Sequence, residues 1–104
     1  MKDIYIRLDN EQTYKSAITS ALISPWMFSF PNRIAPPKYE DAKKWYHGNS
    51  KLLLHLFFND LTNKYEMQIS TATIAKSYPQ NKKLNIVNWD DMSYEYCAGV
   101  FGEA

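Results

Sequence analysis

The sequence contains a single cysteine and three glycines, and it has no long uncharged apolar run. One thiol excludes an internal disulfide framework, and a lone free cysteine is easiest to maintain in a reducing cytoplasm. The leucines at 52–54 are followed at once by His55, and nothing in the chain approaches the ~20 apolar residues of a membrane-spanning helix. We therefore expect a cytoplasmic protein that does not enter the membrane.

The chain also lacks a strong excess of charge of either sign. Lys and Arg number 12 against 11 Asp and Glu, a net charge of +1, whereas a domain held mainly by phosphates is strongly basic. The distribution is uneven, because residues 84–104 contain four acidic residues and no Lys or Arg. Residues 1–83 hold all 12 basic residues and the other seven acidic ones, a net charge of +5.

With so few glycines there is no phosphate-binding loop, and no spacing of histidine and cysteine predicts a metal site. The sharpest catalytic hypothesis takes Cys97 as a nucleophile with His47 or His55 as its base. Three acidic residues shortly before Cys97 would raise its pKa and make it less reactive. We therefore expect an inert core cysteine, a hydrogen-bonded, half-buried His55, and neither catalytic residues nor a cofactor.

The apolar pattern predicts one α+β domain over residues 1–104. Alternation predicts a strand over 3–9, and the spacing of Asp9 and Gln12 resembles a capping box that begins a helix over about 10–23, which Pro25 ends. The remaining predictions are extended segments over 26–30, 51–58, 64–70, 84–89 and 93–101, and a short helix over about 37–47. Residues 71–83 show no clear pattern. We expect a mostly antiparallel sheet of about four to six strands with the main helix packed on one face.

Aromatic residues make up 15% of the chain, with eight Tyr and three Trp, more than a small core can hide. An aromatic and acidic strip near the C-terminus has the composition of a protein-binding surface; it comprises Trp89, Asp90, Asp91, Tyr94, Glu95 and Tyr96. A plain edge strand protected by charges would have the same pattern, so both interpretations stay open. Trp45 and Tyr46 form a second candidate patch.

These patterns predict a non-catalytic protein-binding module that docks onto a larger host protein, one with a basic groove. Lys, Asn, Ile and Tyr are abundant, a bias of AT-rich coding sequence that is common in phages and mobile elements. An accessory factor that inhibits or redirects a host complex fits this bias. The alternatives are a nucleic-acid-binding regulator with an aromatic sheet face and a self-assembling phage component, which would form homo-oligomers.

Overall fold

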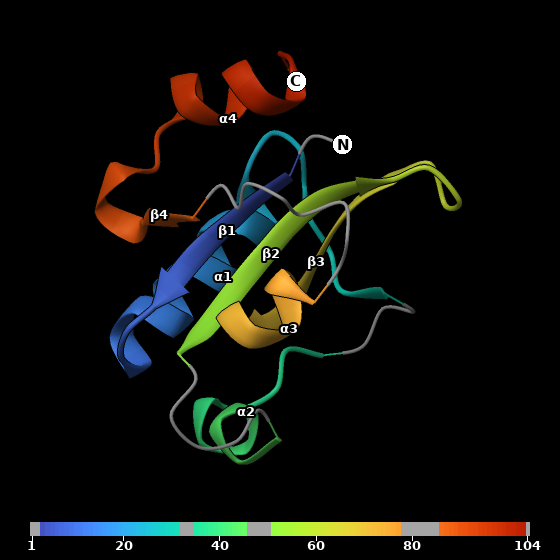
Figure 1. The fold of residues 1–104 in the computed structure, drawn as a ribbon. Helices are drawn as coiled ribbons and strands as arrows, with labels where there is room; N and C mark the ends of the chain where they lie inside the picture. The colour runs from blue at the N-terminus through green and yellow to red at the C-terminus, as the bar shows by residue number, and fades with distance from the viewer. Residues whose placement is uncertain (1–2, 32–34, 46–50, 78–85, 104) are drawn as a thin grey trace.

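Four strands in the order β3-β2-β1-β4 form the centre of the structure (Figure 1). The computed structural model describes residues 3–31, 35–45, 51–77 and 86–103. Its elements are β1 (Asp3–Leu8), α1 (Glu11–Ile23), α2 (Tyr39–Trp45), β2 (Leu52–Asn59), β3 (Lys64–Thr71), α3 (Ala72–Lys76), β4 (Ile86–Asn88), the 3₁₀ helix η2 (Trp89–Asp91) and α4 (Tyr94–Phe101). The predicted α+β class and single domain are confirmed.

The sheet is mixed, with two antiparallel pairs and one parallel pair. β2 runs antiparallel to both β1 and β3, so that Leu54 lies opposite Ile6 on one side and Ile69 on the other. β4 runs parallel to β1, with Val87 beside Ile6. The predicted hairpin over 51–58 and 64–70 is confirmed, as is the mostly antiparallel character of the sheet.

The main core lies between the sheet and α1. Every second residue of β1 and β2 points to this face because side chains alternate along a strand. The strand residues buried there are Ile4, Ile6, Leu8, Leu52, Leu54, Leu56, Met67 and Ile69. α1 covers them with Tyr14, Ala17, Ile18 and Ala21, which confirms the prediction that this helix packs on one sheet face. Its N-cap is Asn10 rather than the expected Asp9, and the Asn10 side chain accepts a hydrogen bond of 2.8 Å from the Thr13 amide.

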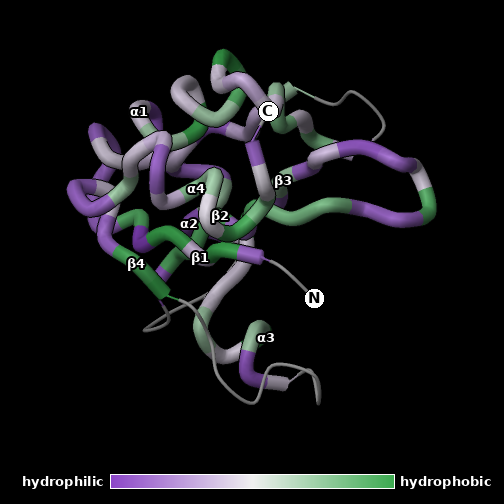
Figure 2. The backbone as a smooth tube through the Cα atoms, turned by 90° about the horizontal axis from the view of Figure 1, so that it is seen from above, coloured by the Kyte–Doolittle hydropathy of each residue, from purple (hydrophilic) through white to green (hydrophobic). Residues whose placement is uncertain are grey.

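The opposite face carries α3, so helices lie on both sides of the sheet (Figure 2). Ala75 of α3 is buried against Tyr5 and Leu53. Thr71 begins the helix, because its side chain accepts a hydrogen bond from the Ile74 amide. α3 falls in the part of the sequence that gave no clear pattern, and residues 78–83 lie outside the described part of the chain.

The predicted strand over 26–30 is wrong. Trp26, Phe28 and Phe30 are all buried. However, Met27 has a φ of 50°, which breaks an extended strand, and the segment pairs with β3 only through an isolated bridge between Ser29 and Glu66. It packs as irregular chain along the β3 edge.

α2 confirms a helix within the predicted range 37–47, but it begins later, at Tyr39. The hydroxyl of Tyr14 donates a hydrogen bond of 2.6 Å to the Pro37 carbonyl, and the Tyr14 and Tyr39 rings lie 5.3 Å apart. These contacts hold the segment beside α1. The predicted end of the helix lies outside the described residues.

The C-terminal prediction of two extended segments is half wrong. Residues 84–89 do contain β4, which ends in the 3₁₀ turn of η2. Residues 93–101, expected as a strand, instead form α4, because the Ser93 side chain caps the Tyr96 amide at 3.1 Å. A helix here buries Cys97 and packs Val100 partly against the core; these two residues are three apart and would lie on opposite faces of a strand.

Candidate functional site: an apolar groove with an acidic border

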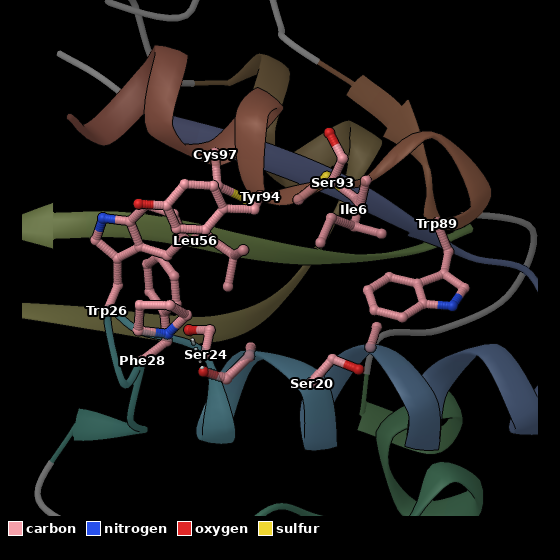
Figure 3. A pocket seen from close by; sticks show the side chains of 14 residues that line it. Ile6, Ser20, Ser24, Trp26, Phe28, Leu56, Trp89, Ser93, Tyr94 and Cys97 are labelled. Carbon is pink, nitrogen blue, oxygen red and sulfur yellow. Dashed lines mark hydrogen bonds between the residues drawn. The ribbon is translucent and has the colours of Figure 1, made fainter. Parts of the chain in front are cut away.

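An apolar groove of about 220 Å³ lies between α1 and the η2–α4 segment (Figure 3). Its floor includes Ile6 and Leu56 of the sheet. The other lining residues are Ala17, Ser20, Ala21, Ser24, Pro25, Trp26, Phe28, Trp89, Met92, Ser93, Tyr94 and Cys97. The three on α1 and Ser24 directly after it are small and recur at helical spacing, so they leave one wall of the groove shallow.

Contacts between α4 and the segment after α1 close one end of the groove. The indole Nε1 of Trp26 donates a hydrogen bond of 3.1 Å to the Gly102 carbonyl. The Phe101 ring lies 5.3 Å from the Phe28 ring in an edge-to-face arrangement. The chain can leave α4 at this point because Gly102 takes a φ of 85°, which favours glycine.

Aromatic side chains mark both ends of the groove. Figure 3 shows Trp26 and Tyr94 together at one end and Trp89 at the other. The Trp26 and Tyr94 rings lie 5.3 Å apart, and Tyr94 remains 48% exposed. A ring that is half exposed and already held in place loses little side-chain freedom on binding a partner.

The wall formed by η2 and α4 has an acidic border. Asp90 and Asp91 lie between the lining residues Trp89 and Met92, and Glu95 follows Tyr94; all three acidic side chains are exposed. Residues 86–103 contain no Lys or Arg. The border therefore carries negative charge that no basic residue of its own segment neutralises.

Chemically, the groove is suited to binding rather than to acid–base work. Its lining residues include no carboxylate, histidine or lysine. Burial raises the pKa of the Cys97 thiol, which disfavours the thiolate that a nucleophile needs. Cys97 thus contributes apolar surface, as the sequence predicted for a core cysteine.

His55 lies on the other face of the sheet and does not meet Cys97. Its Nε2 lies 2.9 Å from Oδ2 of Asp3, and its ring stacks between Tyr5 at 4.2 Å and Phe57 at 4.7 Å. Burial lowers the pKa of His55, while the hydrogen bond and the charge of Asp3 act in the opposite direction. The predicted half-buried, hydrogen-bonded histidine is confirmed; His47 lies outside the described residues.

Some of the residues that the sequence predicted for binding lie at the groove, and others do not. Trp89 and Tyr94 line the groove, with Asp90, Asp91 and Glu95 beside them. Tyr96 is half-buried and packs against the core. Trp45, 62% exposed, lies on α2 at the opposite end of the molecule from α4 (Figure 1), so the two predicted patches do not join. Tyr46 lies outside the described part.

Sequence reasoning missed the other half of the groove. The wall that faces α4 consists of Ser20 on α1 and of Ser24 and Trp26 after the helix. The small residues at 17, 20, 21 and 24 were visible as a helical repeat. Nothing local, however, indicates that a segment some seventy residues later returns to cover them.

Three further findings concern metal binding, membrane spans and similarity to known proteins. Among the described residues, no three His, Cys, Asp or Glu side chains are grouped so that they could hold a metal ion. No helix in that part of the chain has both the length and the apolar character needed to cross a bilayer. Comparison of the chain with family models, curated proteins and solved structures finds no match.

Proposed function

We propose that this protein is a non-catalytic protein-binding module of the cytoplasm that docks onto a larger partner through the groove and its acidic border. The observation that supports the proposal is an apolar hollow bordered on one wall by Asp90, Asp91 and Glu95. Burial of the apolar lining would supply affinity, and the exposed carboxylates would steer a basic partner into place.

The biological setting that we propose is a phage or mobile element, in which the protein inhibits or redirects a host protein complex. The abundance of Lys, Asn, Ile and Tyr supports this setting. An inhibitor of this kind needs affinity and shape but no catalytic group. A groove lined by apolar and hydroxyl side chains is consistent with such a role.

The test is affinity capture with the tagged full-length chain in bacterial lysate, with and without nuclease. Ser20→Trp places a large ring in the groove, since Ser20 lines it and is half-buried. Thr19→Trp is the matched control, because the neighbouring Thr19 is exposed and does not line this groove. Both variants are first compared with wild type by circular dichroism to establish that they fold.

The expected result is a stoichiometric protein that wild type and Thr19→Trp retain after nuclease and that Ser20→Trp loses. A partner retained equally by Ser20→Trp would contradict the groove as the docking surface. Enrichment that disappears with nuclease would favour the nucleic-acid alternative. If no protein is captured and light scattering shows large particles of the pure chain, self-assembly replaces the proposal.

A further inference from the structure

The two walls of the groove differ in charge. The η2–α4 wall has Asp90, Asp91 and Glu95 at its border. The facing flank of α1 offers only alanine and serine, and the two charged residues of α1 are occupied elsewhere: Lys15 pairs with Glu11 at 3.2 Å, and both line a separate hollow beside residues 36–40. An occupant therefore meets negative charge along one side and a neutral, shallow surface along the other.

Addition of a partner strand to the sheet is poorly supported. In the part of the chain that the structure describes, the outer edge of β4 offers three residues, Ile86–Asn88, before the chain turns into η2. At the other edge of the sheet, Ser29 already pairs with β3, accepting a hydrogen bond from the Met67 amide at 2.9 Å. Binding by strand addition depends on a run of free backbone groups at a sheet edge. The described edges of this sheet offer only short runs of such groups.

The groove walls instead favour a helix. At this wall the half-buried Ser20 and Ser24 form a short ridge of small side chains four residues apart, and the buried Ala17 and Ala21 lie at its base. Small side chains in such a ridge let a second helix approach closely and pack its own ridge against them. The hollow of about 220 Å³ compares with the cavity of about 150 Å³ that holds one benzene, so it has room for one or two large apolar side chains.

We propose that the groove binds an amphipathic helix of a partner protein, whose apolar side chains enter the hollow while Lys or Arg on one flank face Asp90, Asp91 and Glu95. This inference rests on the proposed function and specifies the partner's binding element. It also changes which molecule supplies the anchor. The sequence suggested aromatic side chains that enter a partner's groove, whereas here the partner's side chains enter a groove that Trp26, Trp89 and Tyr94 help to form.

The test uses three synthetic peptides without tryptophan and the full-length chain. The first is a fourteen-residue Leu/Lys peptide with leucines at helical spacing, the second replaces every Lys with Glu, and the third alternates Leu and Lys at strand spacing. Binding is followed through indole fluorescence, because Trp26 and Trp89 line the groove, at peptide concentrations below those of self-association. The proteins are wild type, Ser20→Trp, Thr19→Trp and the triple variant Asp90→Asn, Asp91→Asn, Glu95→Gln.

The expected result is saturable binding of the helical Leu/Lys peptide to wild type and to Thr19→Trp, with at least tenfold weaker binding to Ser20→Trp. Removal of three exposed charges should weaken binding about tenfold, and added salt should shrink that difference. The Leu/Glu peptide should bind far more weakly than its lysine counterpart. The triple variant changes only exposed positions, so it serves as the test if Ser20→Trp does not fold.

Equal binding of the Leu/Glu peptide, or unchanged binding to Ser20→Trp and the triple variant, would overturn the inference. Tighter binding of the strand-spaced peptide would also overturn it and assign an extended occupant. The two proposals fail separately. A lysate partner that is lost in Ser20→Trp while no helical peptide binds would leave the docking function in place and remove the helix.

Discussion

The indole Nε1 of Trp26 donates a hydrogen bond of 3.1 Å to the carbonyl oxygen of Gly102, which lies 76 positions further along the chain. This contact joins the end of α1 to the end of α4, and the groove lies between those two helices. The same indole ring also lies 5.3 Å from the Tyr94 ring, at a tilt of 31°. Trp26 therefore connects the two walls of the groove at one end.

We predict that Trp26→Phe destabilises the protein by about 1–3 kcal/mol. The phenyl ring cannot donate to Gly102 and leaves part of the buried volume empty. Urea denaturation measures the free energy of unfolding, and hydrogen exchange should show faster exchange of the α4 amides. Trp45→Phe is the control, because Trp45 is 62% exposed; its effect should stay within about 0.5 kcal/mol. Equal effects of the two substitutions would contradict the role given to Trp26.

We predict that substitution by alanine changes the free energy of unfolding in opposite directions at Gly99 and at Gly102. Gly99 lies inside α4, and an added Cβ would meet no atom within 4 Å. Gly99→Ala should raise the free energy of unfolding by about 0.5–1 kcal/mol, because alanine loses less backbone freedom in a helix. Gly102 also has open space, but its φ of 85° strains any other residue.

Gly102→Ala should therefore lower the free energy of unfolding by about 1–3 kcal/mol. The two variants have the same composition, so urea denaturation under one set of conditions compares them directly. A change of the same sign for both would show that α4 does not end at Gly102 in solution.

The strands of the hairpin and the main helix were readable from sequence because each depends on a local period. Leu52, Leu54 and Leu56 lie on one face, and His55 lies on the other, as alternation requires. The alternation of Trp26 and Phe28 predicted an extended strand. That prediction was wrong, although both side chains are buried, because Met27 adopts a left-handed conformation that apolar alternation does not encode.

The extended segment predicted over 93–101 was wrong because the sequence of α4 fits both a strand period and a helix period. Tyr94 and Tyr96 alternate with polar neighbours as in a strand, whereas the apolar Cys97 and Val100 lie three apart, a spacing that shares one face only in a helix. Ser93 at the N-cap and Gly102 after the last turn are helix start and stop signals, and they favour the helix. The groove could not be predicted in full, because Ser20 becomes a wall only when α4 packs opposite it.

We predict that His55 makes the protein less stable as the pH falls below neutrality. Burial lowers its folded-state pKa below 6.5, so the unfolded chain takes up a proton that the folded protein resists. The free energy of unfolding should therefore fall as the pH drops from 6.5 towards the folded-state pKa, with no contribution above that window. His55→Gln should lose this part of the pH dependence, measured by denaturation between pH 7.5 and 5.

Asp3→Asn provides an independent check on the same histidine. The hydrogen bond and the charge of Asp3 both raise the pKa of His55 against the larger effect of burial. The substitution should therefore lower that pKa further, which an NMR titration of the imidazole resonances can measure. His47→Gln in both proteins assigns the signal to His55. A rise in the pKa after Asp3→Asn would contradict the contact.

The thiol of Cys97 should react slowly while α4 is docked. Cys97 is buried and lines the groove, and burial raises its pKa above the ordinary 9.0. Labelling by a disulfide reagent at pH 7.5 should therefore be much slower than in urea, and its rate should still rise above pH 9. Trp26→Phe should speed the reaction in the folded protein, because it loosens the contact between α4 and the segment after α1. The rate in urea should be the same for both proteins, which controls for reagent and pH.

Cys97→Ser completes this prediction. It places a hydroxyl where the structure has a buried thiol, so we expect a loss of about 1–3 kcal/mol in the free energy of unfolding. Capture of the protein partner should persist, because no step of the proposed function uses thiol chemistry. Loss of the partner by a variant that still folds would instead show that binding depends on the Cys97 thiol. Labelling as fast in buffer as in urea would show that α4 does not cover the thiol.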